Sequence, residues 1–156
     1  MIRRLGAATV LLVLWPLGLT SAPETVRITL PASVTFAVTN VSANTVGAPN
    51  PTSIMFNQAS LIAGHGVRIS VKADSDFVPP SGTAIPASKV SWTITNAVQG
   101  VGSNGVLSTS AYGQVYQGNA NKPTGSVNVS WTLAAPGTSV RAGNHTMTMR
   151  WKMESF

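Results

Sequence analysis

The chain has 156 residues, of which 44% are hydrophobic and only 9% are charged, and its formal net charge is +6. This apolar content excludes a disordered chain, and the scarcity of charged helix formers excludes a coiled coil. The absence of cysteine excludes a disulfide-stabilised scaffold, a thiolate metal site and attachment to lipid through a cysteine.

The N-terminus has the organisation of a secretory signal peptide. Arg3 and Arg4 supply a positive start, an apolar stretch follows over residues 5–19, and small residues come after it. The alternative is a transmembrane anchor, but a span needs about 20 apolar residues, and this run is shorter and contains Pro16. We therefore expect export to the periplasm, the cell surface or the medium, with no membrane span in the mature chain.

Cleavage near residue 22 would divide the chain into a signal peptide, residues 1–22, and a single domain, residues 23–156. The signal carries two of the ten basic residues, so eight basic and four acidic residues give the mature chain a net charge of +4. A domain of this size buries roughly two-thirds of its unfolded surface. That burial suffices for a stable core without disulfides.

Apolar and polar residues alternate through most of the mature chain, a period typical of half-buried β-strands. The strands are rich in Val, Thr, Ile and Trp, which suit a pleated surface. The apolar positions of the predicted strands are Val26, Ile28 and Leu30; Val34, Phe36 and Val38; Ile54 and Phe56; Val67, Ile69 and Val71; Val90, Trp92 and Ile94; Val127, Val129, Trp131 and Leu133; and Met147, Met149, Trp151 and Met153.

Turn residues separate these strands. The strongest hairpin signal is Asn104-Gly105, because a type I′ turn requires positive φ at both central residues. Residues 74–88 are rich in Pro, Gly and Ser and predict a long irregular connection. The apolar residues expected to hold this connection to the core are Phe77, Val78 and Ile85.

Seven to nine short antiparallel strands in one domain predict an all-β fold, an immunoglobulin-like β-sandwich of two layers. Trp92 and Trp131 lie at inward positions of their strands. We expect their side chains to fill the space between the two sheets.

The segment 100–105 matches the pattern G-x-G-x-x-G. A dinucleotide site needs a helix that begins inside this motif and an acidic residue about twenty positions later. The residues that follow do not start a helix, and the next carboxylate is Glu154. We therefore interpret the segment as a glycine-rich hairpin loop.

Carboxylates are scarce, and the pattern predicts neither an enzyme nor a cofactor. Asp74 and Asp76 are the only close pair, and two carboxylates could contribute to a Ca²⁺ site. The alternative is a solvated turn at the end of a strand. There is no G-x-S-x-G nucleophile elbow.

A copper site through His and Met is a second metal hypothesis. His145, Met147, Met149 and Met153 fall on one side of one predicted strand. Neighbours on that side are about 7 Å apart along the strand, too far to share one ion unaided. Core packing of the methionines is the preferred interpretation.

Two pairs of basic residues occupy outward strand positions, Arg68 with Lys72 and Arg150 with Lys152. If the two strands are neighbours, the pairs form a small basic stripe. Such a stripe could meet an anionic glycan or lipid headgroups, and it is also typical of an ordinary solvated face. An exported chain without a recognised binding module is not expected to bind nucleic acid.

Tyr112 and Tyr116 fall on one face of a predicted strand with Gln114 between them, and Phe77 is a further aromatic candidate. Amphipathic aromatics beside amides suit carbohydrate, and they suit a half-buried sheet equally well. Tyr112, Tyr116, Asp74 and Asp76 are therefore the candidate ligand-binding residues.

Residues 141–149, with the sequence RAGNHTMTM, resemble the last strand of bacterial exported immunoglobulin-like sandwiches. Residues 67–71 look like the middle strands of the same domains, which include pilin subunits and spore coat protein U-type domains. The resemblance implies the sandwich fold and a surface location, and it carries over no functional residue.

These features favour an exported, non-enzymatic β-sandwich that serves as a structural or adhesive surface subunit. The partners would be further copies of the chain or other envelope proteins. The alternative is a secreted or periplasmic module that binds a glycan or copper. Residues 24–30 alternate regularly and end at Pro31. This segment is expected to pair within its own sheet, or to add to the open edge of a neighbouring subunit.

Overall fold

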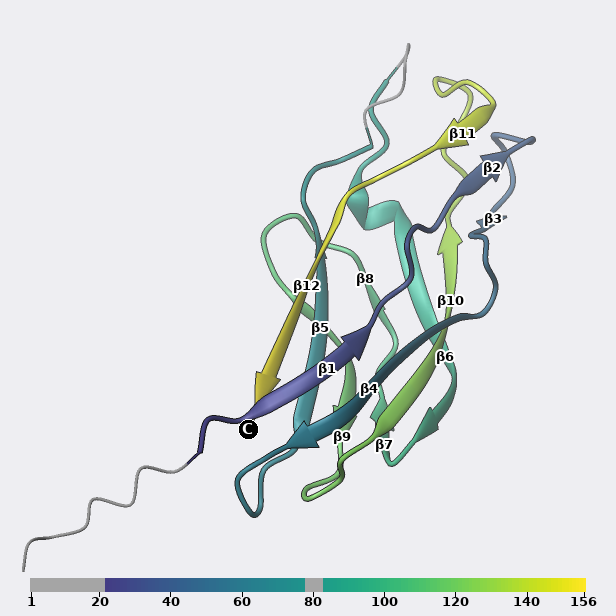
Figure 1. Cartoon of the computed structure of the whole chain (residues 1–156). Coiled ribbons are helices and arrows are strands. Elements are labelled where there is room, and N and C mark those ends of the chain that lie inside the picture. The colour runs from purple at the N-terminus through teal and green to yellow at the C-terminus, as the bar shows by residue number, and fades with distance from the viewer. Residues whose placement is uncertain (1–21, 78–82) are drawn as a thin grey trace, which may run out of the picture.

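A computed structural model describes residues 22–77 and 83–156 of the chain. These residues form twelve strands and one short 3-10 helix, η1 (Ala87–Lys89) (Figure 1). The strands are β1 (Thr25–Thr29), β2 (Phe36–Val38), β3 (Thr45–Val46), β4 (Thr52–Ser60), β5 (Val67–Ala73), β6 (Val90–Val98), β7 (Gly100–Gly102), β8 (Gly105–Val106), β9 (Gly113–Gly118), β10 (Gly125–Leu133), β11 (Gly143–His145) and β12 (Met149–Ser155). The predicted all-β fold is confirmed. Residues 1–21 of the predicted signal peptide lie outside the described residues.

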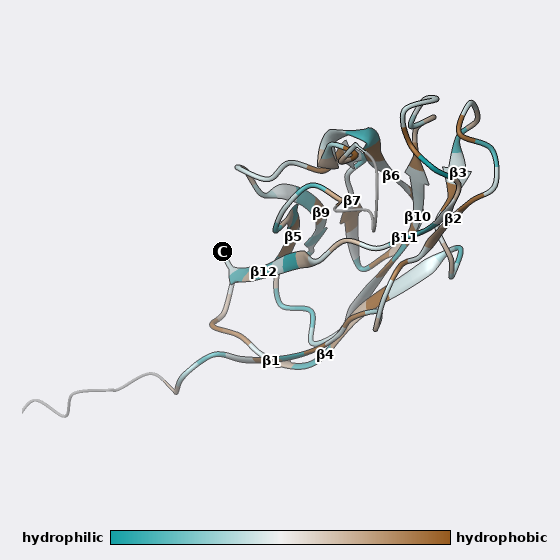
Figure 2. Cartoon of the chain, turned by 90° about the horizontal axis from the view of Figure 1, so that it is seen from above, coloured by the Kyte–Doolittle hydropathy of each residue, from teal (hydrophilic) through white to brown (hydrophobic). Residues whose placement is uncertain are grey.

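The strands form antiparallel sheets throughout. The first sheet has the order β1-β4-β10-β6-β8, with β3 paired to β10, and the second has the order β12-β5-β9-β7. A small third sheet pairs β11 with β2. Seen from above, β12, β5 and β9 lie across from β1, β4 and β10 (Figure 2). The strands β1 and β12 are therefore edges of the two large sheets.

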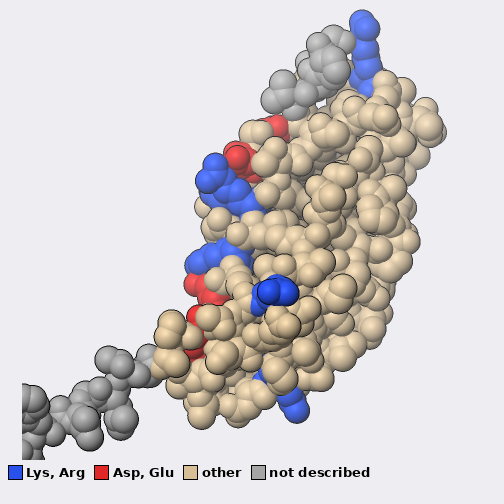
Figure 3. Space-filling view, viewed as in Figure 1, with Lys and Arg blue, Asp and Glu red and all other residues tan. Residues whose placement is uncertain are grey.

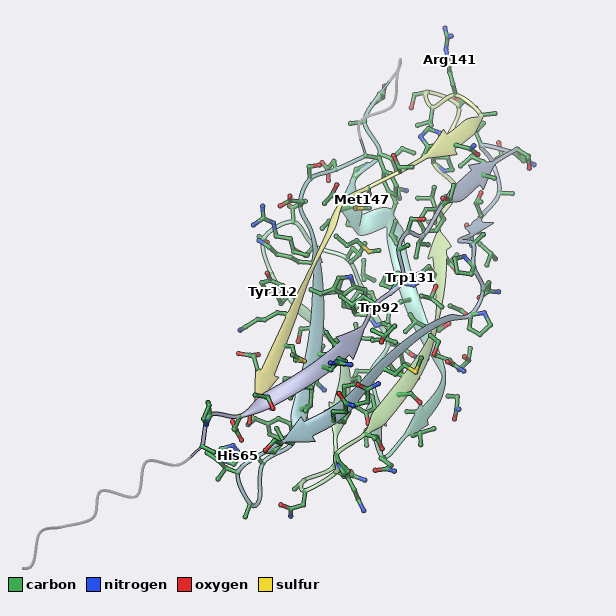
Figure 4. All side chains as sticks on the ribbon, in the orientation of Figure 1. His65, Trp92, Tyr112, Trp131, Arg141 and Met147 are labelled. Atoms are coloured by element: carbon green, nitrogen blue, oxygen red, sulfur yellow. The ribbon has the colours of Figure 1, made fainter. Side chains whose placement is uncertain are left out.

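Aromatic side chains from the two large sheets meet in the core. Phe56 on β4 and Tyr116 on β9 have ring centroids 6.0 Å apart, and Trp131 on β10 lies edge-on to Trp151 on β12 at 6.2 Å. Trp92 and Trp131 are cross-strand partners with centroids 5.8 Å apart. Both are buried, as their inward positions predict (Figure 4).

The connection after β5 is held to the core as predicted. Phe77 and Ile85 are each 1% exposed, and they form an isolated antiparallel bridge. The Phe77 ring also packs edge-on against Phe36 at 6.0 Å. Val78 lies outside the described residues.

The predicted type I′ hairpin at Asn104-Gly105 is wrong, because neither residue has a positive φ. Instead of pairing with each other, β7 pairs with β9 and β8 pairs with β6. The glycine-rich segment 100–105 is therefore a crossing from one sheet to the other. A Cβ on Gly105 would lie 2.3 Å from Trp92 Cζ2, so the glycine is required by the indole that fills the core.

Candidate functional site

The sandwich is open along one side, between the edge strands β1 and β12. The inward side chains of β1 are only half-buried, as are Met149 and Trp151 of β12. Met153, the next inward residue of β12, is 38% exposed. Each strand pairs on one side only among the described residues, so no third strand covers these side chains.

A groove of about 290 Å³ lies where the chain leaves β1 and enters β12. One wall is residues 30–34, which connect β1 to β2, and the other is residues 146–149 with Trp151. Met147 lies on this second wall, beside the start of β12 (Figure 4). Both walls contribute apolar side chains to the groove, among them Leu30, Met147 and Trp151.

A polar cluster fastens the N-terminal end of β1 at the opposite end of the same side. Glu24 Oε1 accepts a hydrogen bond of 2.7 Å from the Ile62 amide and lies 3.0 Å from His65 Nδ1. Ser155 Oγ, at the end of β12, lies 3.0 Å from the same ring nitrogen. The pKa of Glu24 is lowered, first by the Ile62 amide and then by Ser155 and His65.

This cluster contains Ser, His and Glu side chains but lacks the geometry of a nucleophilic triad. A triad needs the hydroxyl and the carboxylate on different nitrogens of the imidazole. Here both groups contact Nδ1 of His65. The arrangement serves to join the start of β1 to the end of β12.

Asp74 and Asp76 point to different partners. Arg150 donates from Nε and Nη2 to the two carboxylate oxygens of Asp74, and this hydrogen bonding lowers the pKa of Asp74. Asp76 accepts a hydrogen bond of 2.8 Å from the Ala87 amide. Within residues 22–77 and 83–156, no three His, Asp or Glu side chains gather as metal ligands.

The candidate copper ligands are divided among three segments. His145 ends β11 and is 5% exposed, with Nε2 at 3.0 Å from the Arg141 carbonyl oxygen. Met147 and Met149 pack against the core as predicted. The prediction of core packing is wrong for Met153, because β12 is an edge and leaves that side chain exposed.

The predicted aromatic platform does not form. Phe77 is in the core, and Tyr116 is fully buried, so Tyr112 and Tyr116 do not share an exposed face. A bulge in the pairing of β9 with β5 breaks the alternation between them. The Tyr116 hydroxyl donates to the Val98 carbonyl at 2.7 Å, and burial raises its pKa.

The condition for a basic stripe is met, because β12 and β5 are neighbours and Arg150 pairs with Lys72 across them. Tyr112, which is 42% exposed, lies over this stripe. Its ring centroid is 5.4 Å from Lys72 Nζ and 5.8 Å from Lys152 Nζ. The sequence analysis singled out the basic residues and Tyr112 separately, but it did not predict that the tyrosine ring lies beside the lysines.

Two features escaped the sequence analysis altogether: the groove between the edges and the cluster around Glu24. Residues 30–34 and 146–149 are far apart in the chain. Only the order in which the strands pair brings these two segments together as the walls of one groove. The sequence shows Glu24 near the start of the predicted domain and His65 in a turn. Their contact depends on the closure of the sandwich.

Comparisons of the chain with family models, curated proteins and solved structures gave no match. In the part of the chain that the structure describes, no helix is long and apolar enough to cross a lipid bilayer. The class of protein defined by the structure is therefore an antiparallel all-β domain with two facing sheets.

Proposed function

We propose that the protein is an exported, non-enzymatic structural or adhesive subunit that assembles with further copies of itself. The observation that carries this proposal is the open side of the sandwich between β1 and β12. An exposed edge offers unpaired backbone donors and acceptors to another chain. Here two edges flank half-buried apolar side chains, which adds a reason to cover them.

The occupant that fits this side is the β1 segment of a second copy. In the single chain β1 pairs with β4, with Ile28 opposite Phe56 and Thr29 opposite Met55. When β1 leaves its own sheet, it can add to the free edge of β12 in a neighbour, with main-chain hydrogen bonds between the two strands. Val26 and Ile28 then cover the half-buried side chains of the open side, and such an exchange of a strand between copies is a low-cost route to assembly.

The connection after β1 is suited to act as the hinge of this exchange. Residues 30–34 form the groove wall and carry the chain from β1 to β2. Pro31 interrupts the strand, because proline has no N–H to donate to a ladder. The hydrogen bonds that retain β1 at its other end involve the exposed Glu24 cluster.

The test is the oligomeric state of the mature protein by size-exclusion chromatography, with negative-stain microscopy of the assembled fraction. Filaments or stable oligomers are expected at high concentration. Deletion of residues 23–31 is expected to leave a folded monomer that no longer self-associates. A mature protein that stays monomeric at high concentration would contradict the proposal, as would a deletion that unfolds the domain.

A matched pair of substitutions tests the open side without removing a strand. Met153 on β12 is 38% exposed and Val98 on β6 is 44% exposed. Met153→Lys places a charge at the inward row of the edge and is expected to weaken association at least several-fold. Val98→Lys adds the same charge to a strand that pairs with neither β1, β4 nor β12, and it is expected to leave association unchanged. Equal effects of the two substitutions would exclude the β12 edge as part of the interface.

A further inference from the structure

The outer face of the second sheet holds much of the charge of the described chain. Arg68 and Lys72 come from β5, and Arg150, Lys152 and Glu154 come from β12. Figure 3 shows charged side chains gathered along the side of the molecule where β12 lies, beside a largely uncharged surface. The register places Arg150 opposite Lys72 and Glu154 opposite Arg68.

These charged side chains of β5 and β12 are called the strip below. Aromatic rings accompany the cations at both ends of the strip. Tyr112 is the ring at the Lys72 end, within 6 Å of two ammonium groups. Phe156 is the ring at the other end, with the Arg68 guanidinium 4.5 Å from its centroid. The two rings are 42% and 39% exposed, so each retains surface for a ligand.

The strip is longer than a single small anion. Lys72 and Arg68 are four residues apart on β5, which corresponds to roughly 13 Å along a strand. Repeated cations along this length match a polymer that carries an anionic group on successive units. Exposed aromatic rings add apolar surface on which sugar rings can stack.

We propose that the outer face of β5 and β12, with Tyr112, binds an acidic polysaccharide whose sugar units carry carboxylates. Lys72 is the main contact for the ligand, because it forms no ion pair within 4.0 Å in the part of the chain that the structure describes. Its ammonium binds a sugar carboxylate, and Tyr112 stacks against the sugar ring. This binding does not depend on self-association of the chain.

The carboxylates within the strip favour a sugar over a membrane surface. Asp74 pairs with Arg150, and Glu154 lies 2.7 Å from Lys152. A flat anionic bilayer would bring headgroups against both carboxylates at once, which opposes its approach. A polysaccharide can place its carboxylates beside Lys72 and its hydroxyls beside Asp74 and Glu154, because carboxylate oxygens accept hydrogen bonds from sugar hydroxyls.

A second copy of the chain is a poor ligand for the same face. The mature chain has only four acidic residues, and Asp74 and Glu154 are already paired within the strip. The chain therefore lacks an acidic surface to place against its own basic face.

The test is titration of the mature protein with oligogalacturonate by isothermal titration calorimetry, at a protein concentration where chromatography shows one monomeric species. Binding is expected to weaken as salt rises, because exposed charges are screened. The methyl-esterified oligogalacturonate has the same sugar backbone without free carboxylates, and it is expected not to bind. Equal binding of the esterified probe, or no binding of the free acid, would overturn the proposal.

Four substitutions locate the binding surface. Tyr112→Ala and Lys72→Gln are each expected to weaken binding on the order of fivefold, the scale of one exposed cation or ring contact. Tyr112→Phe keeps the ring and should bind as the unmodified protein does. Lys122→Gln removes an exposed lysine in the β9–β10 connection and is the matched control. Unchanged affinity of Tyr112→Ala, with its fold verified by tryptophan fluorescence, would overturn the proposal.

Vesicles of phosphatidylglycerol provide the comparison with lipid. The proposal predicts tighter binding to oligogalacturonate than to the vesicles at the same ionic strength. Tighter vesicle binding that Tyr112→Ala abolishes would assign the face to a membrane and overturn the proposal. The oligomeric state is measured separately in each sample, so failure here leaves the proposed assembly unaffected, and failure of assembly leaves this binding unaffected.

Discussion

The central strand β10 and the edge strand β1 share an alternating sequence but differ in burial. In β10 every second residue from Gly125 to Leu133 is buried, whereas no residue of β1 is fully buried. The difference follows from their places in the sheet, since β10 lies between β4 and β6 and β1 pairs with β4 alone. An alternating pattern therefore predicts which side chains point inward, and the strand order decides how completely they are covered.

The two regions are also held by different interactions. Around β10 the contacts are largely aromatic, with Trp131 between Trp92 and Trp151. At the start of β1 they are polar, with Glu24 held by the Ile62 amide and His65. Burial provides most of the free energy of folding, and exposed polar contacts provide little. We therefore expect the central strands to unfold only with the whole domain and β1 to detach more easily.

The largest expected effect is that of Trp131→Ala. The side chain is 0% exposed and contacts aromatic rings from both sheets. Its truncation removes buried apolar surface and leaves a cavity, so the free energy of unfolding should fall by about 3–5 kcal/mol. Urea denaturation followed by circular dichroism measures this change. A decrease below about 1 kcal/mol would show that the aromatic cluster is not the centre of the core.

A smaller effect separates two isoleucines of neighbouring strands. Ile54 on β4 is 0% exposed, whereas Ile28 on β1 is half-buried. Ile54→Ala should lower the free energy of unfolding by about 2–5 kcal/mol, and Ile28→Ala by about 1 kcal/mol because less apolar surface is lost. The free energies of unfolding of both variants are measured by urea denaturation at a concentration where the protein is monomeric. Equal losses would mean that β1 is covered as completely as β4, and the contrast between edge and centre would disappear.

The fold class and most of the core were predictable because they depend on local alternation. The inward positions of Trp92, Trp131 and Phe36 follow from the period of two, and all three side chains are buried. The irregular connection was also recognised from its composition, and Phe77 and Ile85 anchor it. These features need only the local sequence and the preference of apolar side chains for the interior.

The features that failed depend on pairing between distant segments. Asn104-Gly105 has the composition of a tight hairpin, but its glycine serves the close approach of Trp92. Tyr116 has the spacing of an exposed partner of Tyr112, and a bulge turns it into the core. Met153 has the spacing of a core residue and lies on an edge. Register and strand order decide all three, and neither is encoded in the spacing along one strand.

The smallest expected effect tests the polar attachment of β1 through the pH dependence of stability. The pKa of Glu24 is lowered from its ordinary value of 4.5, first by the hydrogen bond from the Ile62 amide and then by Ser155 and His65. A carboxyl with a lower pKa in the folded chain stabilises the fold above its unfolded pKa. This contribution is lost as the pH falls toward the folded pKa.

The Glu24→Gln variant should therefore have a lower melting temperature than the unmodified protein near neutral pH. The gap should narrow as the pH falls below 4.5, the unfolded value, because the unmodified carboxyl is then neutralised too. Differential scanning calorimetry across this range measures the gap, and the same samples show by chromatography whether loosening Glu24 promotes assembly. A gap that stays constant from neutral pH to about pH 3 would show that the Glu24 charge does not fasten β1. The attachment of β1 would then have to come from its apolar contacts with β4.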